Sequence, residues 1–177
     1  MSDEAEEIRW TGKFITARTR GKWEYVTRAR GIRAAVIVAI DDEDHVLLVE
    51  QYRVPLQRLC LELPAGLIGD DDSAQGEDAL DAAARELEEE TGYRAERIES
   101  LGEFYSSPGM VSESFTLVRA YGLTKVGPGG GTDGEDITVH RVACAHLPQF
   151  VEMARTRGLG IDVRLLMLLA PSLLGGK

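Results

Sequence analysis

The sequence contains little cysteine and no long apolar run. Its 2 cysteines, Cys60 and Cys144, fit neither a CxxC nor a Cys/His zinc spacing, so we expect reduced thiols rather than disulfides or bound zinc. The longest apolar stretch near the C-terminus, Leu165 to Ala170, is far shorter than the ~20 residues that cross a bilayer. The N-terminus is acidic and polar, whereas a signal peptide begins basic and becomes apolar. These absences predict a cytoplasmic protein with no membrane partner.

The sequence also contains fewer basic than acidic residues. The 177 residues carry 20 basic and 30 acidic side chains, which gives a formal net charge of -10. Such a surplus repels phosphate backbones, so we expect no nucleic-acid partner. A small phosphate-bearing molecule can still bind where carboxylates surround a divalent cation. The length and a hydrophobic content of 44% predict one compact domain over residues 1–177.

Apolar segments separated by turn-like residues predict that the first part of the chain is rich in strands. Residues from about Trp10 to Arg30 are expected to form two short strands around a turn at Thr19–Lys22, and Ile32–Ile40 and His45–Arg53 a hairpin. Further strands are expected at Ile98–Tyr105, Ser114–Tyr121 and Ile137–Ala143, and helices near Leu147–Arg157 and Ile161–Leu169. The glycine-rich segment Val126–Asp136 is expected to be a mobile loop between two strands of one sheet.

A loop over Glu62–Glu77 precedes an expected helix at Glu77–Thr91 that ends at Gly92. Apolar residues recur at helical spacing at Leu80, Ala84 and Leu87. This stripe leaves the glutamates that follow on another face. The pattern predicts that one face packs while another carries charge.

The end of this helix crowds 4 glutamates into the positions from Glu86 to Glu90. Like charges at i,i+4 oppose helix formation by a few tenths of a kcal/mol per pair. Glu86 and Glu90 are four apart and Glu86 and Glu89 three apart, so their carboxylates can converge on one point. Hard oxygen ligands of this kind suit Mg²⁺, with Mn²⁺ possible as an alternative ion. A solvated acidic face is the alternative interpretation.

The residues around these glutamates resemble the Nudix box, written GX5EX7REUXEEXGU with U an aliphatic or aromatic residue. Glu77 is followed after seven residues by Arg85–Tyr93, which matches every fixed position, and the preceding Glu62–Gly66 (ELPAG) is typical of the ADP-ribose pyrophosphatase branch. The resemblance implies an α/β fold, a Nudix-type α/β/α sandwich with a mixed β-sheet and an N-terminal antiparallel strand extension. One departure is that Gly66 and Glu77 enclose ten residues instead of five. We interpret Leu67–Gly76 as carrying a five-residue acidic insertion in a surface loop.

The resemblance also implies a set of metal ligands. Glu86 and Glu90 would be the principal ligands of Mg²⁺. Glu89 would be a further ligand or a partner of metal-bound water, and the carbonyl of Ala65 an additional ligand.

Other residues of the family pattern would support the catalytic site. Glu77 and Arg85 would orient it through charge-assisted hydrogen bonds. The segment Thr132–His140 resembles the acidic loop that carries the general base in ADP-ribose pyrophosphatases, so the resemblance favours Glu135 as the base, with Asp133 second. An ordinary flexible loop with incidental acids is the alternative.

Substrate contacts are implied outside the box. The segment beginning at Trp23 resembles the part of dimeric relatives that reaches across the interface. Trp23 would stack on the base and Glu24 would contact it, while Arg28 and Arg53 would bind phosphate. Pro108, sixteen positions after Gly92, resembles a feature of the ADP-ribose-preferring subgroup. Core packing of Trp23, surface solvation of the arginines and a simple turn at Pro108 are the alternatives.

The function implied is hydrolysis of the diphosphate bond of a nucleoside-diphosphate sugar, with ADP-ribose cut to AMP and ribose 5-phosphate. A homodimer joined through residues 1–30 is expected. A GDP-mannose or broad nucleotide-sugar pyrophosphatase is one alternative. A non-catalytic nucleotide-sugar sensor is another, although such a module has no need of mutually repelling glutamates.

Overall fold

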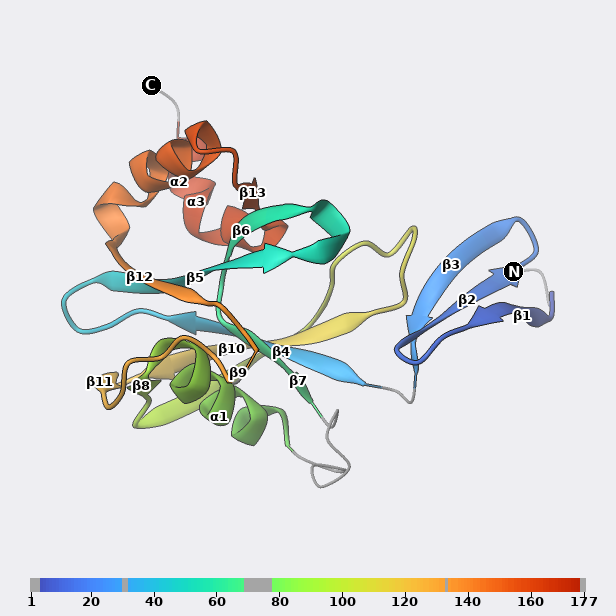
Figure 1. Ribbon diagram of the computed structural model, residues 1–177, viewed down its shortest axis with the longest axis horizontal. Helices are drawn as coiled ribbons and strands as arrows, with labels where there is room; N and C mark the ends of the chain where they lie inside the picture. The colour runs from blue at the N-terminus through green and yellow to red at the C-terminus, as the bar shows by residue number, and fades with distance from the viewer. Residues whose placement is uncertain (1–3, 30–31, 69–77, 133, 176–177) are drawn as a thin grey trace.

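The computed structural model describes residues 4–29, 32–68, 78–132 and 134–175. Two four-stranded sheets form its centre. Helix α1 (Ala79–Thr91) covers one side, while α2 (Leu147–Thr156) and α3 (Leu166–Leu174) cover the other (Figure 1). This layering confirms the α/β/α sandwich.

Both central sheets mix parallel and antiparallel pairing. The first has the order β7 (Ala65–Ile68), β4 (Arg33–Ala39), β10 (Ser114–Tyr121) and β9 (Arg97–Tyr105), and only β4 and β10 are parallel within it. The second has the order β12 (Thr138–Ala143), β5 (His45–Arg53), β6 (Arg58–Glu62) and β13 (Gly160–Ile161), and only β6 and β13 are parallel within it. Strands β8 (Tyr93–Arg94) and β11 (Thr124–Lys125) form a small ribbon. Short 3-10 turns lie at Val54–Leu56, Cys144–His146 and Val163–Leu165.

The hairpin expected over Ile32–Arg53 is wrong. Strands β4 and β5 belong to different sheets and are joined at their turn by the bridge between Ile40 and Val46. Both strands are buried on both faces, and each pairs with two other strands in its own sheet. Along β4, Val36 and Val38 face the core under α2 and α3, while Ala35 and Ile37 face the core under α1. The pattern identified the strands but not their partners.

Several other boundaries also differ from expectation. The loop Val126–Asp136 joins β11 and β12, which lie in different sheets rather than one. Part of the expected loop Glu62–Glu77 is a strand, β7, and the last helix begins at Leu166 rather than Ile161. The insertion proposed within Leu67–Gly76 falls mostly outside the described residues. No helix in the described part of the chain is both long and apolar enough to cross a bilayer.

The two N-terminal strands expected around the turn at Thr19–Lys22 are present, and a third strand precedes them. Strands β1 (Glu6–Thr11), β2 (Ile15–Arg20) and β3 (Trp23–Arg28) make an antiparallel sheet that projects from one side of the body (Figure 1). The antiparallel strand extension is therefore confirmed. A bridge between Val26 and Val111 ties β3 to the connection between β9 and β10.

Helix α1 is capped at both ends. The side chain of Asp78 accepts a hydrogen bond from the Leu80 amide at 2.8 Å, and Gly92 is the C-cap. The expected apolar stripe is wrong at Ala84, which is exposed, because Ala83 takes that place beside Leu87. The same buried face continues to Glu90, which is only 4% exposed. A carboxylate therefore lies where the pattern placed only apolar side chains.

Candidate active site

A charged cavity of about 680 Å³ opens where α1, β5, β6, β7 and the segment before α3 meet. Carboxylates and guanidinium groups share its lining. The acidic side chains from α1 and the glycine-rich loop are Glu86, Glu90 and Glu135. The basic side chains are Arg28, Arg53 and Arg164. Opposite charges thus meet in one volume large enough for a small molecule.

Glu90 is the most deeply placed of the predicted ligands. Its Oε2 accepts a hydrogen bond from the Ala65 amide at 2.9 Å. Burial, reinforced by the nearby charges of Glu86 and Glu135, raises the pKa of Glu90 to about 8, although the Ala65 amide and Arg53 oppose this shift. The carboxylate therefore needs a compensating positive charge to stay ionised.

Glu86 lies between α1 and β7. A Cβ on Gly66 would stand 1.9 Å from both Cγ and Cδ of Glu86, so only glycine permits this approach. Burial raises the pKa of Glu86 above its usual range, while Arg85 pulls it down. Arg85 Nη1 donates to Oε1 of Glu86 at 2.9 Å and to Oε2 of Glu89 at 3.0 Å. Glu89 does not line the cavity.

The donors at the cavity fit a hard divalent cation. Glu86, Glu90 and Glu135 offer carboxylate oxygens, and burying these like charges together is unfavourable without a counter-charge. Mg²⁺ and Mn²⁺ take few protein ligands and complete their shell with water and phosphate. Within the described residues, which leave out Glu77, no three His, Cys, Asp or Glu side chains stand as a preformed metal site. Water and phosphate oxygens of the substrate would complete the shell.

Glu135 is the one predicted base that the structure describes. It lines the cavity, and its charge acts on both Glu86 and Glu90. Its Oε2 accepts from the Thr132 amide at 2.9 Å. Asp133 and Glu77 lie outside the described residues, so their predicted roles rest on the sequence alone.

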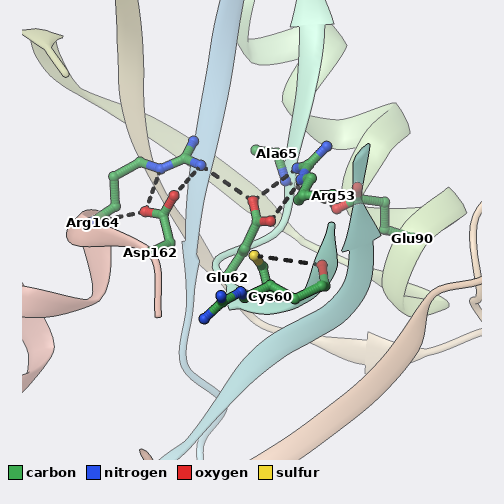
Figure 2. Close-up of polar contacts among 8 residues, drawn as sticks. Arg53, Cys60, Glu62, Ala65, Glu90, Asp162 and Arg164 are labelled. Carbon is green, nitrogen blue, oxygen red and sulfur yellow. Dashed lines mark hydrogen bonds and ion pairs between the residues drawn. The ribbon is translucent and has the colours of Figure 1, made fainter. Parts of the chain in front are cut away.

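Arg53 belongs to a chain of ion pairs at the cavity, shown in Figure 2. Its Nε and Nη2 bind the two carboxylate oxygens of Glu62 at 2.6 and 2.8 Å. Arg164 Nη2 reaches the same carboxylate at 3.3 Å and binds Asp162 through Nε and Nη2, both at 2.7 Å. Glu62 is only 3% exposed, and a buried carboxylate of this kind requires such partners.

Of the other residues predicted to bind substrate, one lies at the cavity and three do not. Arg28 lines the cavity, with its Nε bound to Glu113 at 2.6 Å. Trp23 is 64% exposed on the N-terminal sheet, so core packing is excluded. Trp23, Glu24 and Pro108 do not line the cavity of their own chain.

Sequence reasoning missed four of the charged residues at the cavity, which are Glu62, Glu113, Asp162 and Arg164. Glu62 was noted only as part of a motif, and Asp162 and Arg164 were placed in an expected helix without a role. A basic residue inside the apolar run that follows Asp162 was the one available signal. The proximity of Asp162 and Arg164 to Glu62 depends on the pairing of β13 with β6, which no local pattern predicts.

The fold and cavity together define an α/β/α sandwich enzyme with a glutamate-bearing helix at its site. Residues 31–151 match the NUDIX domain family. The chain belongs to the Nudix hydrolase family, and its relatives place it near the ADP-ribose pyrophosphatase branch. An uncharacterised Nudix hydrolase of Schizosaccharomyces pombe is 31% identical over 180 residues, covering 92% of this chain and 85% of that one.

Two shorter matches and one solved structure add detail. The methanol dehydrogenase activator of Bacillus methanolicus is 42% identical over 58% of this chain and 53% of its own. The ADP-ribose pyrophosphatase of Bacillus subtilis is 41% identical over 45% of this chain and 40% of its own. These alignments thus span about half the length of either relative or less. The crystal structure of an ADP compounds hydrolase is similar with a TM-score of 0.69 and 26% identity, covering 97% of this chain and 92% of that one.

Proposed function

We propose that the protein hydrolyses the diphosphate bond of a nucleoside-diphosphate sugar in a metal-dependent reaction, and that ADP-ribose is cut to AMP and ribose 5-phosphate. The observation that carries this proposal is the cavity itself. Acidic groups from α1 and its neighbouring loop line the same volume as three arginines. A diphosphate needs cations on both sides, from a metal and from guanidinium groups.

Each acidic residue has a distinct proposed role. Glu86 and Glu90 would hold Mg²⁺ or Mn²⁺, with the Ala65 carbonyl as an additional ligand and Glu89 as a further ligand or a partner of metal-bound water. When bound, such an ion neutralises phosphate charge and makes coordinated water more acidic. Glu135 accepts the proton of the attacking water, and Asp133 is the second candidate. Arg85 holds Glu86 and Glu89 through the hydrogen bonds described above, and Glu77 is proposed to orient the same site.

Arg28 and Arg53 are proposed to bind the phosphates. Each guanidinium is bound to a glutamate in the structure, Arg28 to Glu113 and Arg53 to Glu62. A guanidinium has five N–H donors, so each arginine can bind phosphate without leaving its glutamate. The fixed carboxylate would hold the planar donor group in place.

We further propose that residues 1–177 form one Nudix domain that dimerises through residues 1–30. The N-terminal sheet exposes large apolar side chains on both faces, Ile8 and Trp23 on one and Trp10 and Ile15 on the other, and exposed aromatic side chains of this kind can serve an interface. Trp23 and Glu24 would then contact the base in the cavity of the second copy, near Pro108. A folded Trp23→Ala variant should show a raised KM for ADP-ribose, and an unchanged KM would refute the stacking role. A cytoplasmic location is part of the same proposal.

The experiment that tests the function is a panel of nucleotide sugars incubated with and without Mg²⁺. AMP release from ADP-ribose that requires the metal is the expected result. Faster release of GMP from GDP-mannose, or equal release of nucleoside monophosphate from many nucleotide sugars, would favour the broader pyrophosphatase. Saturable binding without any product would favour a sensor and overturn the proposed hydrolysis.

A further inference from the structure

The glycine-rich loop is bonded to the end of the glutamate helix. Helices leave their last carbonyls without intrahelical partners, and in α1 these belong to residues that include Glu89 and Glu90. Three amides donate hydrogen bonds to these carbonyls: Gly92 to Glu88 at 2.8 Å, Gly131 to Glu89 at 3.0 Å and Gly130 to Glu90 at 2.8 Å. The ammonium group of Lys125 donates to the carbonyl of Thr91 at 2.9 Å. The loop therefore completes the C-terminal cap of α1.

Lys125 also places a positive charge at the C-terminal end of α1. The last turn of α1 contains no basic residue and carries several glutamates, although the C-terminal end of a helix favours positive charge. The Lys125 ammonium group supplies that charge and also reaches the Pro128 carbonyl at 3.3 Å. It thereby links the helix end to the start of the loop.

Gly129 makes this close contact possible. Its φ is +71°, and a Cβ there would stand 2.4 Å from the Thr91 carbonyl carbon and 2.8 Å from the Glu90 carbonyl oxygen. Both neighbours are backbone atoms that cannot rotate away. Any side chain at this position would push the loop off the helix.

The anchored segment leads directly to Glu135. The Ile137 amide donates to the Gly130 carbonyl at 3.3 Å, and the Glu135 amide donates to the Thr132 carbonyl at 3.0 Å. These bonds fold the loop so that Glu135 lines the cavity with Glu86 and Glu90. The backbone of the helix that carries the acids thus holds the loop that carries the third carboxylate.

We propose that Gly129, Gly130 and Gly131, here called the glycine clamp, are positioning residues that fix Glu135 relative to Glu86 and Glu90. The inference rests on the proposed function for its catalytic consequence. Glycine is required at Gly129 by steric contact, and the amides of Gly130 and Gly131 set the register of the loop. A loop held in this way keeps the base at one place while substrate enters and leaves.

The test compares Gly129→Ala with Gly127→Ala in the full chain. A Cβ on Gly127 meets nothing within 4 Å, so that variant changes the same loop without disturbing the clamp. With ADP-ribose and Mg²⁺, we expect Gly129→Ala to lower kcat about ten- to hundredfold while KM changes less than about twofold. Gly127→Ala should match the unsubstituted protein. A kcat within about twofold of normal in Gly129→Ala would overturn the inference.

Amide hydrogen exchange in metal-free protein gives a readout that is independent of turnover. The amides of Gly130 and Gly131 should be protected in the unsubstituted protein and in Gly127→Ala, and should exchange rapidly in Gly129→Ala. Equal protection in all three proteins would contradict the clamp. If no nucleotide sugar is hydrolysed, the proposed function fails, while this exchange experiment still decides whether the loop is clamped.

Lys125→Met provides a second variant if Gly129→Ala does not fold. It removes the ammonium group but leaves the glycine amides bonded, so we expect kcat to fall about threefold with unchanged KM. Gly130 and Gly131 should exchange moderately faster. Loss of kcat without any change in exchange would show that Lys125 acts by another route and would count against the clamp.

Discussion

At Gly66 the lack of a side chain lets β7 pass directly beside Glu86. We predict that Gly66→Ala lowers kcat about hundredfold, because the added Cβ would overlap the Glu86 side chain and displace its carboxylate. The free energy of unfolding should change little, since the Glu86 side chain can rotate toward the cavity. Steady-state kinetics and thermal unfolding of the same preparation measure the two effects. Retention of normal kcat would mean that the position of Glu86 does not matter for turnover.

Asp162 gives a pH-dependent contribution to stability. Burial raises the pKa of its carboxyl, but the hydrogen bonds and charge of Arg164 outweigh burial, so the pKa lies below the usual value. A carboxyl with a lowered folded-state pKa adds stability above its unfolded pKa and loses it as the pH falls through its folded pKa. We predict that Asp162→Asn lowers the free energy of unfolding by about 1–2 kcal/mol at neutral pH. The deficit should shrink as the pH falls below the normal aspartate range.

Glu152→Gln is the matched control for this measurement. Glu152 pairs with Arg155 at 3.6 Å on the surface of α2, and its side chain is 70% exposed. Surface pairs of this kind contribute little, so the variant should follow the unsubstituted protein at every pH. A deficit in Asp162→Asn that is the same at acidic and neutral pH would contradict the role given to its charge.

At the scale of elements, the position of α1 depends on its two ends. At the N-terminal end, Asp78 caps the Leu80 amide. We predict that Asp78→Ala costs about 1 kcal/mol of unfolding free energy, measured by urea denaturation. Asp81→Asn, in the same first turn, should cost only a few tenths of a kcal/mol because it loses a dipole contact and not a cap. Equal losses in the two variants would show that the cap contributes nothing specific.

The elements that carry periodic signals could be predicted from the sequence. The spacing from Glu77 to Gly92 placed the helix and its glutamates together, and Gly92 was correctly identified as its end. The strands β9, β10 and β12 were located by their alternation to within a few residues. These signals are local, because each depends on residues that are neighbours along one element.

Features that depend on contacts between distant elements could not be predicted. The exposure of Ala84 and the burial of Glu90 follow from how α1 rests on β7 and β4. The ion pairs of Arg164 depend on a segment about a hundred residues away from Glu62. The bonds of Gly130 and Gly131 to α1 depend on backbone amides, which carry no residue-specific signal.

At the scale of the whole molecule, two layers meet at one charged cavity. Helix α1 brings acids from one side of the sandwich, and the segment before α3 brings Arg164 and Asp162 from the other. The Glu62 carboxylate lies between Arg53 and Arg164 and accepts hydrogen bonds from both. This arrangement would let one small volume hold the proposed metal, the diphosphate and the attacking water.

We propose that buried carboxylates of α1 hold a divalent cation for diphosphate cleavage, and the kcat of Glu90→Gln at saturating Mg²⁺ decides whether they do. Glu88→Gln is the control, because Glu88 lies on the same helix but pairs with Arg94 on the surface. We predict that Glu90→Gln loses about 10²- to 10³-fold in kcat with the fold intact, while Glu88→Gln keeps normal turnover. Near-normal turnover in Glu90→Gln would contradict the claim.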